Sequence, residues 1–80
     1  MRADDIAEQL KQRPFVPFRM CFSDGTQYDV RHPEMLLVSQ RALALTIFGR
    51  PGAKMAERII LCDPMHIARI EQINVEEART

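Results

Sequence analysis

Six side chains in this sequence are considered as metal ligands, nucleophiles or bases. They are Cys21, His32, Glu34, Cys62, Asp63 and His66. None of them stands at a recognised ligand spacing, and the two cysteines form no CxxC pair. A metal site would require the fold to bring His32 close to His66, and we expect both histidines in surface turns instead. The sequence therefore predicts neither a metal ion nor a cofactor.

Nucleophilic catalysis by a cysteine is not indicated either. Cys21 and Cys62 each lie within an apolar run typical of a β strand, where burial disfavours the reactive thiolate. No GxSxG motif, phosphate-binding loop or dinucleotide fingerprint supports another reaction. A chain of 80 residues also has little room for a pocket that excludes water. We predict that the protein is not an enzyme.

Basic side chains suggest a second kind of site, for nucleic acid or another anion. The candidate residues are Arg41, Arg50, Lys54, Arg58 and His66. Three of these cations lie in or beside a glycine-containing loop, where phosphate groups would favour such a cluster. Stacking on bases requires exposed aromatic rings, however, and most of the four phenylalanines and the tyrosine are expected in the core. We favour a charged solvent-exposed loop over a binding site.

Length and composition limit the organisation of the chain. Residues 1–80 form a single small domain, with 11 basic and 11 acidic residues, acidic ends and a slightly basic middle. The first twelve residues are charged and contain no apolar signal segment, and no apolar run approaches the length of a membrane span. We therefore expect a cytoplasmic protein whose cysteines stay reduced and which does not bind membranes.

A β hairpin over residues 17–31 is the strongest structural signal. Asp24-Gly25 lies between two alternating runs, which is typical of a tight hairpin turn. A three-residue loop places Phe22 opposite Thr26 and puts the apolar side chains on one face, whereas a two-residue loop mixes apolar with polar partners. We predict the three-residue loop, with Gly25 in the left-handed region.

The other elements follow from periodicity and turn residues. Residues 4–12 predict a short amphipathic helix, with Asp5 and Glu8 at the spacing of a capping box. Strands are predicted over residues 35–39, 42–48, 58–62 and 67–73, followed by a polar tail over residues 74–80. The fold class is therefore α+β and mostly β, with a short helix before a small bent antiparallel sheet or a partly open barrel of the SH3/Sm kind.

The later strands are apolar on both faces, in contrast to the first hairpin. Ile59-Ile60-Leu61-Cys62 and Met35-Leu36-Leu37-Val38 show no alternation. One short helix covers only part of one face, and barrel closure is the competing way to hide the rest. We predict self-association instead, with a two-fold dimer as the favoured form.

Two resemblances accompany these patterns. The first is carried by Pro14-Phe15-Val16-Pro17-Phe18-Arg19, then Asp24-Gly25, Val30 and His32-Pro33-Glu34. This series resembles a family of small uncharacterised bacterial proteins with the pattern PFxPFR…DG…V.HPE. The resemblance covers nearly the whole chain and implies a bacterial cytoplasmic protein without an established activity.

The second resemblance is architectural, to the Sm-like fold of the Hfq-type RNA chaperones. Gly25 matches that family's turn glycine, and His66 matches the histidine of its Tyr-Lys-His turn. Pro64 and Met65 occupy the tyrosine and lysine positions, and Val30 stands at a glycine that bends a strand. We therefore predict a non-catalytic interaction or assembly module with an unknown protein partner. The alternative is an Sm-like RNA-binding protein that uses the basic loop and His66.

Overall fold

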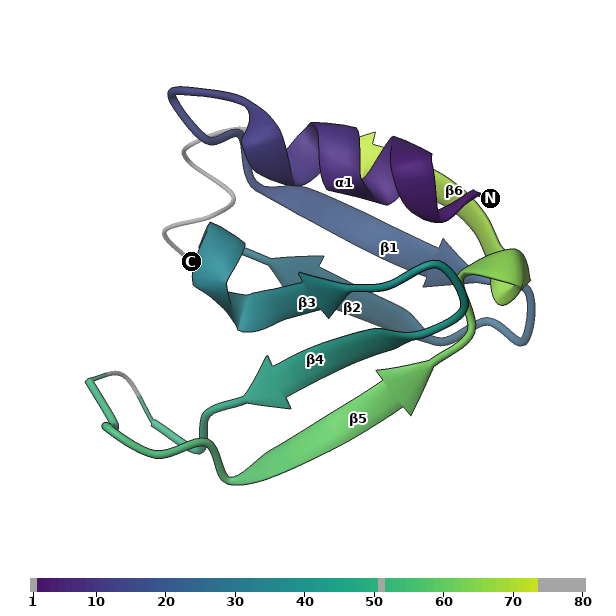
Figure 1. Ribbon diagram of the computed structural model, residues 1–80. Helices are drawn as coiled ribbons and strands as arrows, with labels where there is room; N and C mark the ends of the chain where they lie inside the picture. Colours follow the sequence, from purple (N-terminus) through teal and green to yellow (C-terminus); the bar gives the residue numbers. More distant parts are fainter. Residues whose placement is uncertain (1, 51, 74–80) are drawn as a thin grey trace.

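The computed structural model describes residues 2–50 and 52–73 (Figure 1). Within these residues, the helix α1 (Ala3–Lys11) precedes six strands arranged as two three-stranded antiparallel sheets. The first sheet has the order β2 (Gln27–Val30), β1 (Phe18–Phe22) and β6 (Ile67–Gln72), and the second has the order β3 (Leu36–Val38), β4 (Leu43–Ile47) and β5 (Arg58–Cys62). In this part of the chain no strand pairing joins the sheets into a closed barrel. The predicted mostly β, open antiparallel fold with an N-terminal helix is confirmed.

The first hairpin has the predicted register. Phe18 pairs with Val30, and Met20 pairs with Tyr28, as the three-residue loop requires. The backbone N–H of Phe22 donates to Thr26 at 2.8 Å, and that of Gly25 donates to Phe22 at 3.0 Å. Gly25 has φ 91°, in the left-handed region that side chains other than glycine rarely adopt.

A single core lies between the two sheets. Its fully buried side chains come from α1, from the inner face of the first sheet and from the inner face of the second. They are Ile6, Phe18, Met20, Val30, Leu36, Leu43, Leu45 and Ile67. Neither sheet has more than three strands, so each depends on the other to remove its apolar face from water.

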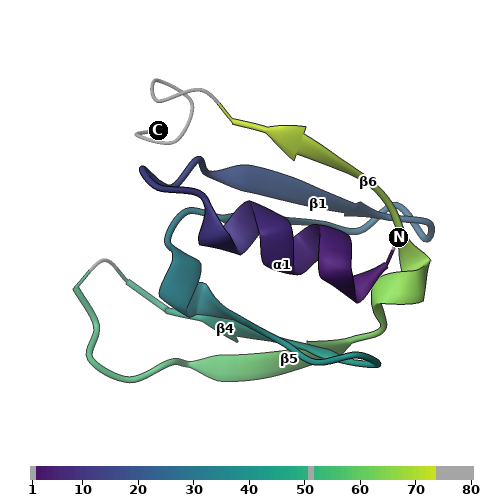
Figure 2. The ribbon, with the colours of Figure 1, turned by 45° about the horizontal axis from the view of Figure 1, so that its top comes forward.

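The helix α1 covers one opening between the sheets. Figure 2 shows α1 between the strands β1 and β6 and the strands β4 and β5. Ile6 is fully buried in the core and Leu10 packs against it, which accounts for the i, i+4 apolar pair in the sequence. The predicted capping box was wrong: the helix begins at Ala3, so Asp5 lies in its first turn, and the N-cap position makes no side-chain hydrogen bond. The acidic side chains still favour the positive end of the helix dipole.

Two short 3-10 helices modify the predicted strand boundaries. Residues 33–35 form η1 (Pro33–Met35), so the strand predicted over residues 35–39 begins one residue later, at Leu36. The fixed φ of Pro33 favours this turn, which is closed by hydrogen bonds from Met35 to His32 and from Leu36 to Pro33. A second one, η2 (Pro64–His66), precedes β6.

The remaining boundaries agree with the prediction to within about one residue. Strand β5 spans the predicted residues 58–62, while β4 and β6 are slightly shorter than predicted. The turn before β4 is closed by Ser39, whose side-chain oxygen accepts from the backbone N–H of Ala42 at 3.1 Å. The predicted tail over residues 74–80 lies outside the described residues.

The left-handed conformation of Gly25 leads to a prediction about the stability of the protein. A Cβ added at Gly25 would meet no atom within 4 Å, so any cost of a substitution comes from the backbone conformation alone. Gly25→Ala should therefore lower the free energy of unfolding by about 1 kcal/mol or more. Gly25→Asn is the matched control and should cost less, because asparagine tolerates the left-handed region. Urea denaturation measures both; equal midpoints for all three proteins would contradict the assignment.

Candidate functional site

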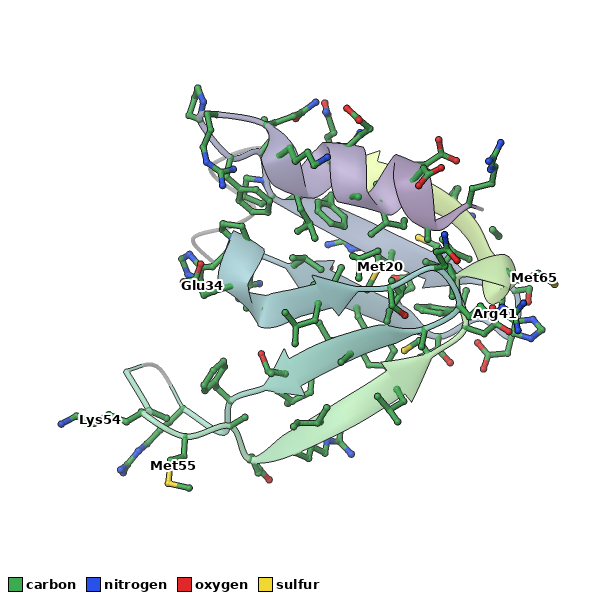
Figure 3. All side chains as sticks on the ribbon, in the orientation of Figure 1. Met20, Glu34, Arg41, Lys54, Met55 and Met65 are labelled. Carbon is green, nitrogen blue, oxygen red and sulfur yellow. The ribbon has the colours of Figure 1, made fainter. Side chains whose placement is uncertain are left out.

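The basic residues considered as an anion site do not all come together. Figure 3 shows Lys54 at one end of the second sheet and Arg41 at the other. Arg50 lies in the same loop as Lys54, and Arg58 begins β5 opposite Ile47 at that end. The expectation that Arg41 would join this group was wrong, because strand β4 separates the two ends by about 16 Å.

His66 also lies away from the basic loop. It ends η2, next to Met65, and Figure 3 places Met65 near Arg41. The candidate set is thus divided between two ends of the molecule. Among the described residues, moreover, no group of three or more histidine, cysteine, aspartate and glutamate side chains is arranged to hold a metal ion.

The two cysteines are free and differ in burial. Cys21 is buried, whereas Cys62 is half-buried at the end of β5. Burial raises the pKa of the Cys62 thiol above its ordinary value. At neutral pH the thiol is therefore less ionised than that of a free cysteine.

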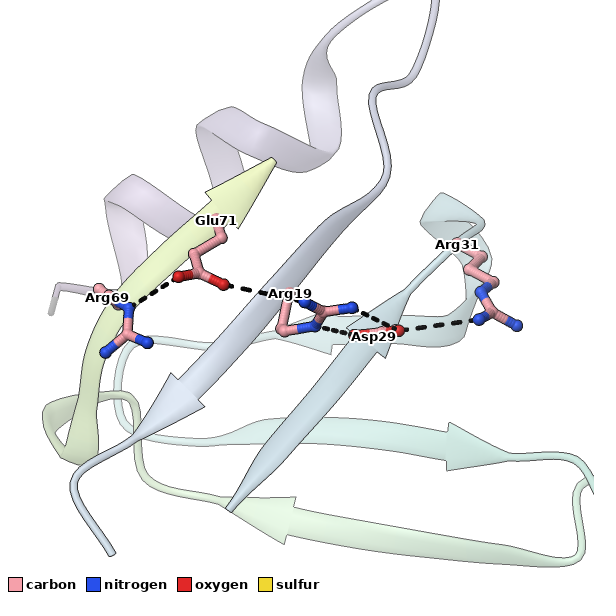
Figure 4. A network of polar contacts seen from close by, with 5 residues as sticks. All are labelled: Arg19, Asp29, Arg31, Arg69 and Glu71. Carbon is pink, nitrogen blue, oxygen red and sulfur yellow. Dashed lines mark hydrogen bonds and ion pairs between the residues drawn. The ribbon is translucent and has the colours of Figure 1, made fainter. Parts of the chain in front are cut away.

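The outer face of the first sheet is charged and internally paired. Figure 4 shows Arg19 on the central strand between Asp29 on β2 and Glu71 on β6. Arg19 Nε lies 2.8 Å from Asp29 Oδ1, as the predicted hairpin register implied, and Arg69 Nε lies 3.0 Å from Glu71 Oε2. The hydrogen bond from Arg69 to Glu71 raises the pKa of Arg69. These side chains are partly exposed, so each ion pair contributes little stability, but together they give this face a polar surface.

The outer face of the second sheet is apolar. The register places Leu37, Ala44 and Leu61 in one cross-strand row and Thr46 and Ile59 in the next. These five residues point away from the core, because their neighbours along each strand, such as Leu36 and Leu45, are buried in it. We call this group the apolar face. Leu37 is 71% exposed, Ile59 64% and Leu61 76%.

A cleft of about 420 Å³ lies where the end of the first hairpin meets β5. Its lining residues are Phe22, Ser23, Asp24, Thr26 and Tyr28 from the hairpin, and Ile60, Leu61, Cys62, Asp63 and His66 from β5 and the segment after it. Phe22 and Tyr28 pack edge to face, with ring centroids 5.8 Å apart. The volume is in the range of small-ligand sites, and the lining combines aromatic, aliphatic and ionisable groups.

Two carboxylates lie on the wall of this cleft. The backbone N–H of Thr26 donates to Asp24 Oδ1 at 2.9 Å, and this hydrogen bonding lowers the pKa of Asp24. Asp63 Oδ1 accepts in the same way from the backbone N–H of Met65, at 2.9 Å. Among the described residues neither carboxylate forms an ion pair with a lysine or arginine. Both are exposed, so the cleft presents negative charge to solvent.

Sequence reasoning identified parts of these surfaces but not the cleft. Asp24 and Gly25 were predicted only as turn residues, and Asp63 and His66 were considered only as candidate metal ligands or, for His66, as an anion contact. The cleft forms because the two sheets pack over each other, which brings residues 22–28 beside residues 60–66. No local pattern signals that contact.

Comparisons with family models, curated proteins and solved structures found no match for this chain. None of the helices in the described residues has the length and apolar character needed to cross a membrane.

The burial of Cys62 leads to a prediction about thiol reactivity. In a Cys21→Ser variant, the remaining Cys62 should react slowly with Ellman's reagent at neutral pH, because its raised pKa leaves little thiolate. The rate should rise with a midpoint above about pH 8.5, the value of an unperturbed thiol. Cys62→Ser, which retains only the buried Cys21, is the control and should react more slowly still. Fast labelling of Cys62 below neutral pH would contradict the prediction.

Proposed function

We propose that the protein is a small non-catalytic interaction module that assembles with a second copy of itself through the apolar face. The observation that supports it most is the exposure of Leu37, Ile59 and Leu61 on one side of the second sheet. Burying neighbouring exposed aliphatic side chains against another molecule removes them from water, which favours association.

The chemistry of the apolar face favours a second copy as the occupant. Its five residues carry no charge, so the complementary surface is another apolar sheet face. Each copy supplies one such face, and a two-fold axis brings two identical patches together. Sheets pack face to face about 10 Å apart, with their strands roughly aligned.

The area of the face suggests a weak dimer. A fully exposed leucine or isoleucine offers roughly 100 Å² of apolar side-chain surface. The three exposed side chains therefore contribute about 200 Å² on each copy, worth about 10 kcal/mol in total when both are buried. Association costs about 4–15 kcal/mol, so the net affinity is modest and the dimer should dissociate on dilution.

Within this proposal, the fold is an open variant of the SH3/Sm-like architecture. Supporting it are the return of the last strand to pair with the first and the 3-10 helix that precedes the last strand. The two free thiols are consistent with a protein that works in the reducing cytoplasm.

Self-association should be visible as a molar mass that rises with concentration. Light scattering across the micromolar range should give values between those of one and two chains. Leu37→Lys places a charge on the apolar face and should give a monomer at all concentrations. Met65→Lys is the matched control: Met65 is 77% exposed but lies outside the face, so this variant should still associate. A monomeric wild type, or equal disruption by both variants, would refute the proposal.

RNA binding is the second candidate function. Its support is that Phe48, the one exposed aromatic side chain among the described residues, directly follows β4 at the end that bears Arg50, Lys54 and Arg58. A ring beside cations is the usual arrangement for binding single strands.

We nevertheless expect no tight, salt-sensitive binding to single-stranded A-rich or U-rich RNA at micromolar protein. Glu57 lies within this basic group, and Arg41 and His66 lie at the other end. Fluorescence anisotropy at several salt concentrations tests the expectation. Tight binding that weakens steeply with salt, and that is lost in an Arg50→Ala, Lys54→Ala double variant, would promote this candidate over assembly.

A further inference from the structure

The cleft follows the edge of a strand. Ile60, Leu61 and Cys62 are consecutive residues of β5, and all three line it. Side chains alternate between the two faces of a sheet, so Leu61 points away from the side that Ile60 and Cys62 occupy. A cavity lined by residues of both orientations must therefore run along the edge of β5.

This edge of β5 is unpaired in the described part of the chain. Strand β5 is the last in its sheet and pairs with β4 alone, so alternate backbone N–H and C=O groups on its other side meet no strand. Proteins usually protect such edges with charged side chains, prolines or bulges. The edge strand β6 carries Arg69 and Glu71, whereas β5 is apolar from Ile59 to Cys62.

We propose that the cleft binds an extended peptide segment of a partner protein, which adds a strand to β5 and carries alternating apolar and basic side chains. Backbone hydrogen bonds to β5 supply a general affinity, and the pockets beside the strand select the side chains. Apolar side chains enter between Tyr28 and Cys62. Basic side chains reach Asp24 and Asp63, the two exposed carboxylates on the wall of the cleft.

The charge of the cleft decides the chemistry of the partner. An acidic peptide or a nucleic acid would meet two carboxylates that no lysine or arginine of the described residues neutralises. A basic segment supplies countercharge beyond that of His66, which lines the cleft and acts electrostatically on Asp24. The two proposals use different parts of β5, because the apolar face lies on the outer side of the sheet and the peptide pairs with the edge of the strand; Leu61 alone belongs to both surfaces.

Synthetic peptides test strand addition directly. The probe is a short fluorescein-labelled peptide of alternating valine and lysine, acetylated and amidated at its ends, and its control has glutamate in place of lysine. We expect the lysine peptide to bind at least about tenfold more tightly than the glutamate peptide in fluorescence anisotropy. Two further versions carry N-methyl groups on alternate backbone nitrogens, one in each register. An added strand points alternate N–H groups at its neighbour, so one methylated version should lose binding and the other should retain it.

Protein variants locate the binding site. Asp24→Asn combined with Asp63→Asn removes both charges, while the amide oxygens still accept the hydrogen bonds from Thr26 and Met65. This double variant should bind the lysine peptide about tenfold more weakly. Asp5→Asn combined with Glu8→Gln, which changes the net charge equally on the exposed side of α1, should bind like the wild type. Amide chemical shifts should change in residues 22–28 and 60–66.

Several results would overturn the inference. They are no binding at millimolar peptide, equal binding of the lysine and glutamate peptides, equal binding of both methylated peptides, or shift changes on the apolar face in place of the cleft. The remaining alternative is that a second copy of the protein, and not a peptide, binds the edge of β5. The molar mass of the protein with bound peptide distinguishes the two. If the peptide converts a dimer into monomers, and Leu37→Lys on the apolar face leaves that dimer intact, the edge of β5 is where the second copy binds, and the proposal of a peptide partner is wrong.

Discussion

The left-handed conformation at Gly25 determines which side of β1 faces the core. With Gly25 at φ 91°, the hairpin closes with Phe22 beside Thr26, and every later pair along β1 and β2 follows. A shift of one residue would turn Arg19 inward and Met20 outward, at the cost of burying a charge. Strand β1 is the central strand of its sheet, so its orientation also determines which side chains of β6 face the core. The second sheet packs against this inner face, and its packing therefore depends on the orientation of β1.

Interactions between residues close together in the chain were predictable from the sequence, because a short turn fixes how its flanking residues pair. The hairpin register, the pairing of Arg19 with Asp29 and the extent of β5 each depend on residues close together in the chain, or on a turn that joins them. The prediction of a capping box was wrong because the three-residue spacing of Asp5 and Glu8 also fits two residues inside the helix. The separation of Arg41 and His66 from the basic loop was not predicted. It depends on the direction in which β4 runs, which composition does not encode. Neither the cleft nor the absence of barrel closure has a local signature.

The two outer sheet faces have opposite characters, and this difference has a physical consequence. On the first sheet the charged side chains are arranged as a row across three strands, with Arg19 between two carboxylates, which keeps that face hydrated. On the second sheet the corresponding positions carry no charge, and Leu37, Ile59 and Leu61 among them are exposed aliphatic side chains. Apolar burial is the main driving force of association, so contacts with other molecules should concentrate on the second sheet. The two sheets thus differ: the outer face of the first is charged, and the outer face of the second is the one that we propose for assembly.

The cleft that we propose as a peptide site lies where the sheet is left open. A closed barrel would pair β5 with another strand and would leave no edge for a partner. Among the described residues β5 ends its sheet, and the first hairpin approaches it through side chains, Tyr28 among them, without backbone pairing. The helix α1 fills the opening between the sheets over Ile6 but contributes no residue to the cleft at the end of β5. Leaving this edge unpaired gives up backbone hydrogen bonds that closure would have made, and β5 carries no charge after Arg58 to keep other strands away. A partner strand can cover an edge of this kind, and for that reason we assign the cleft to a peptide. The apolar face presents side chains and not a strand edge, and we assign it to a second copy.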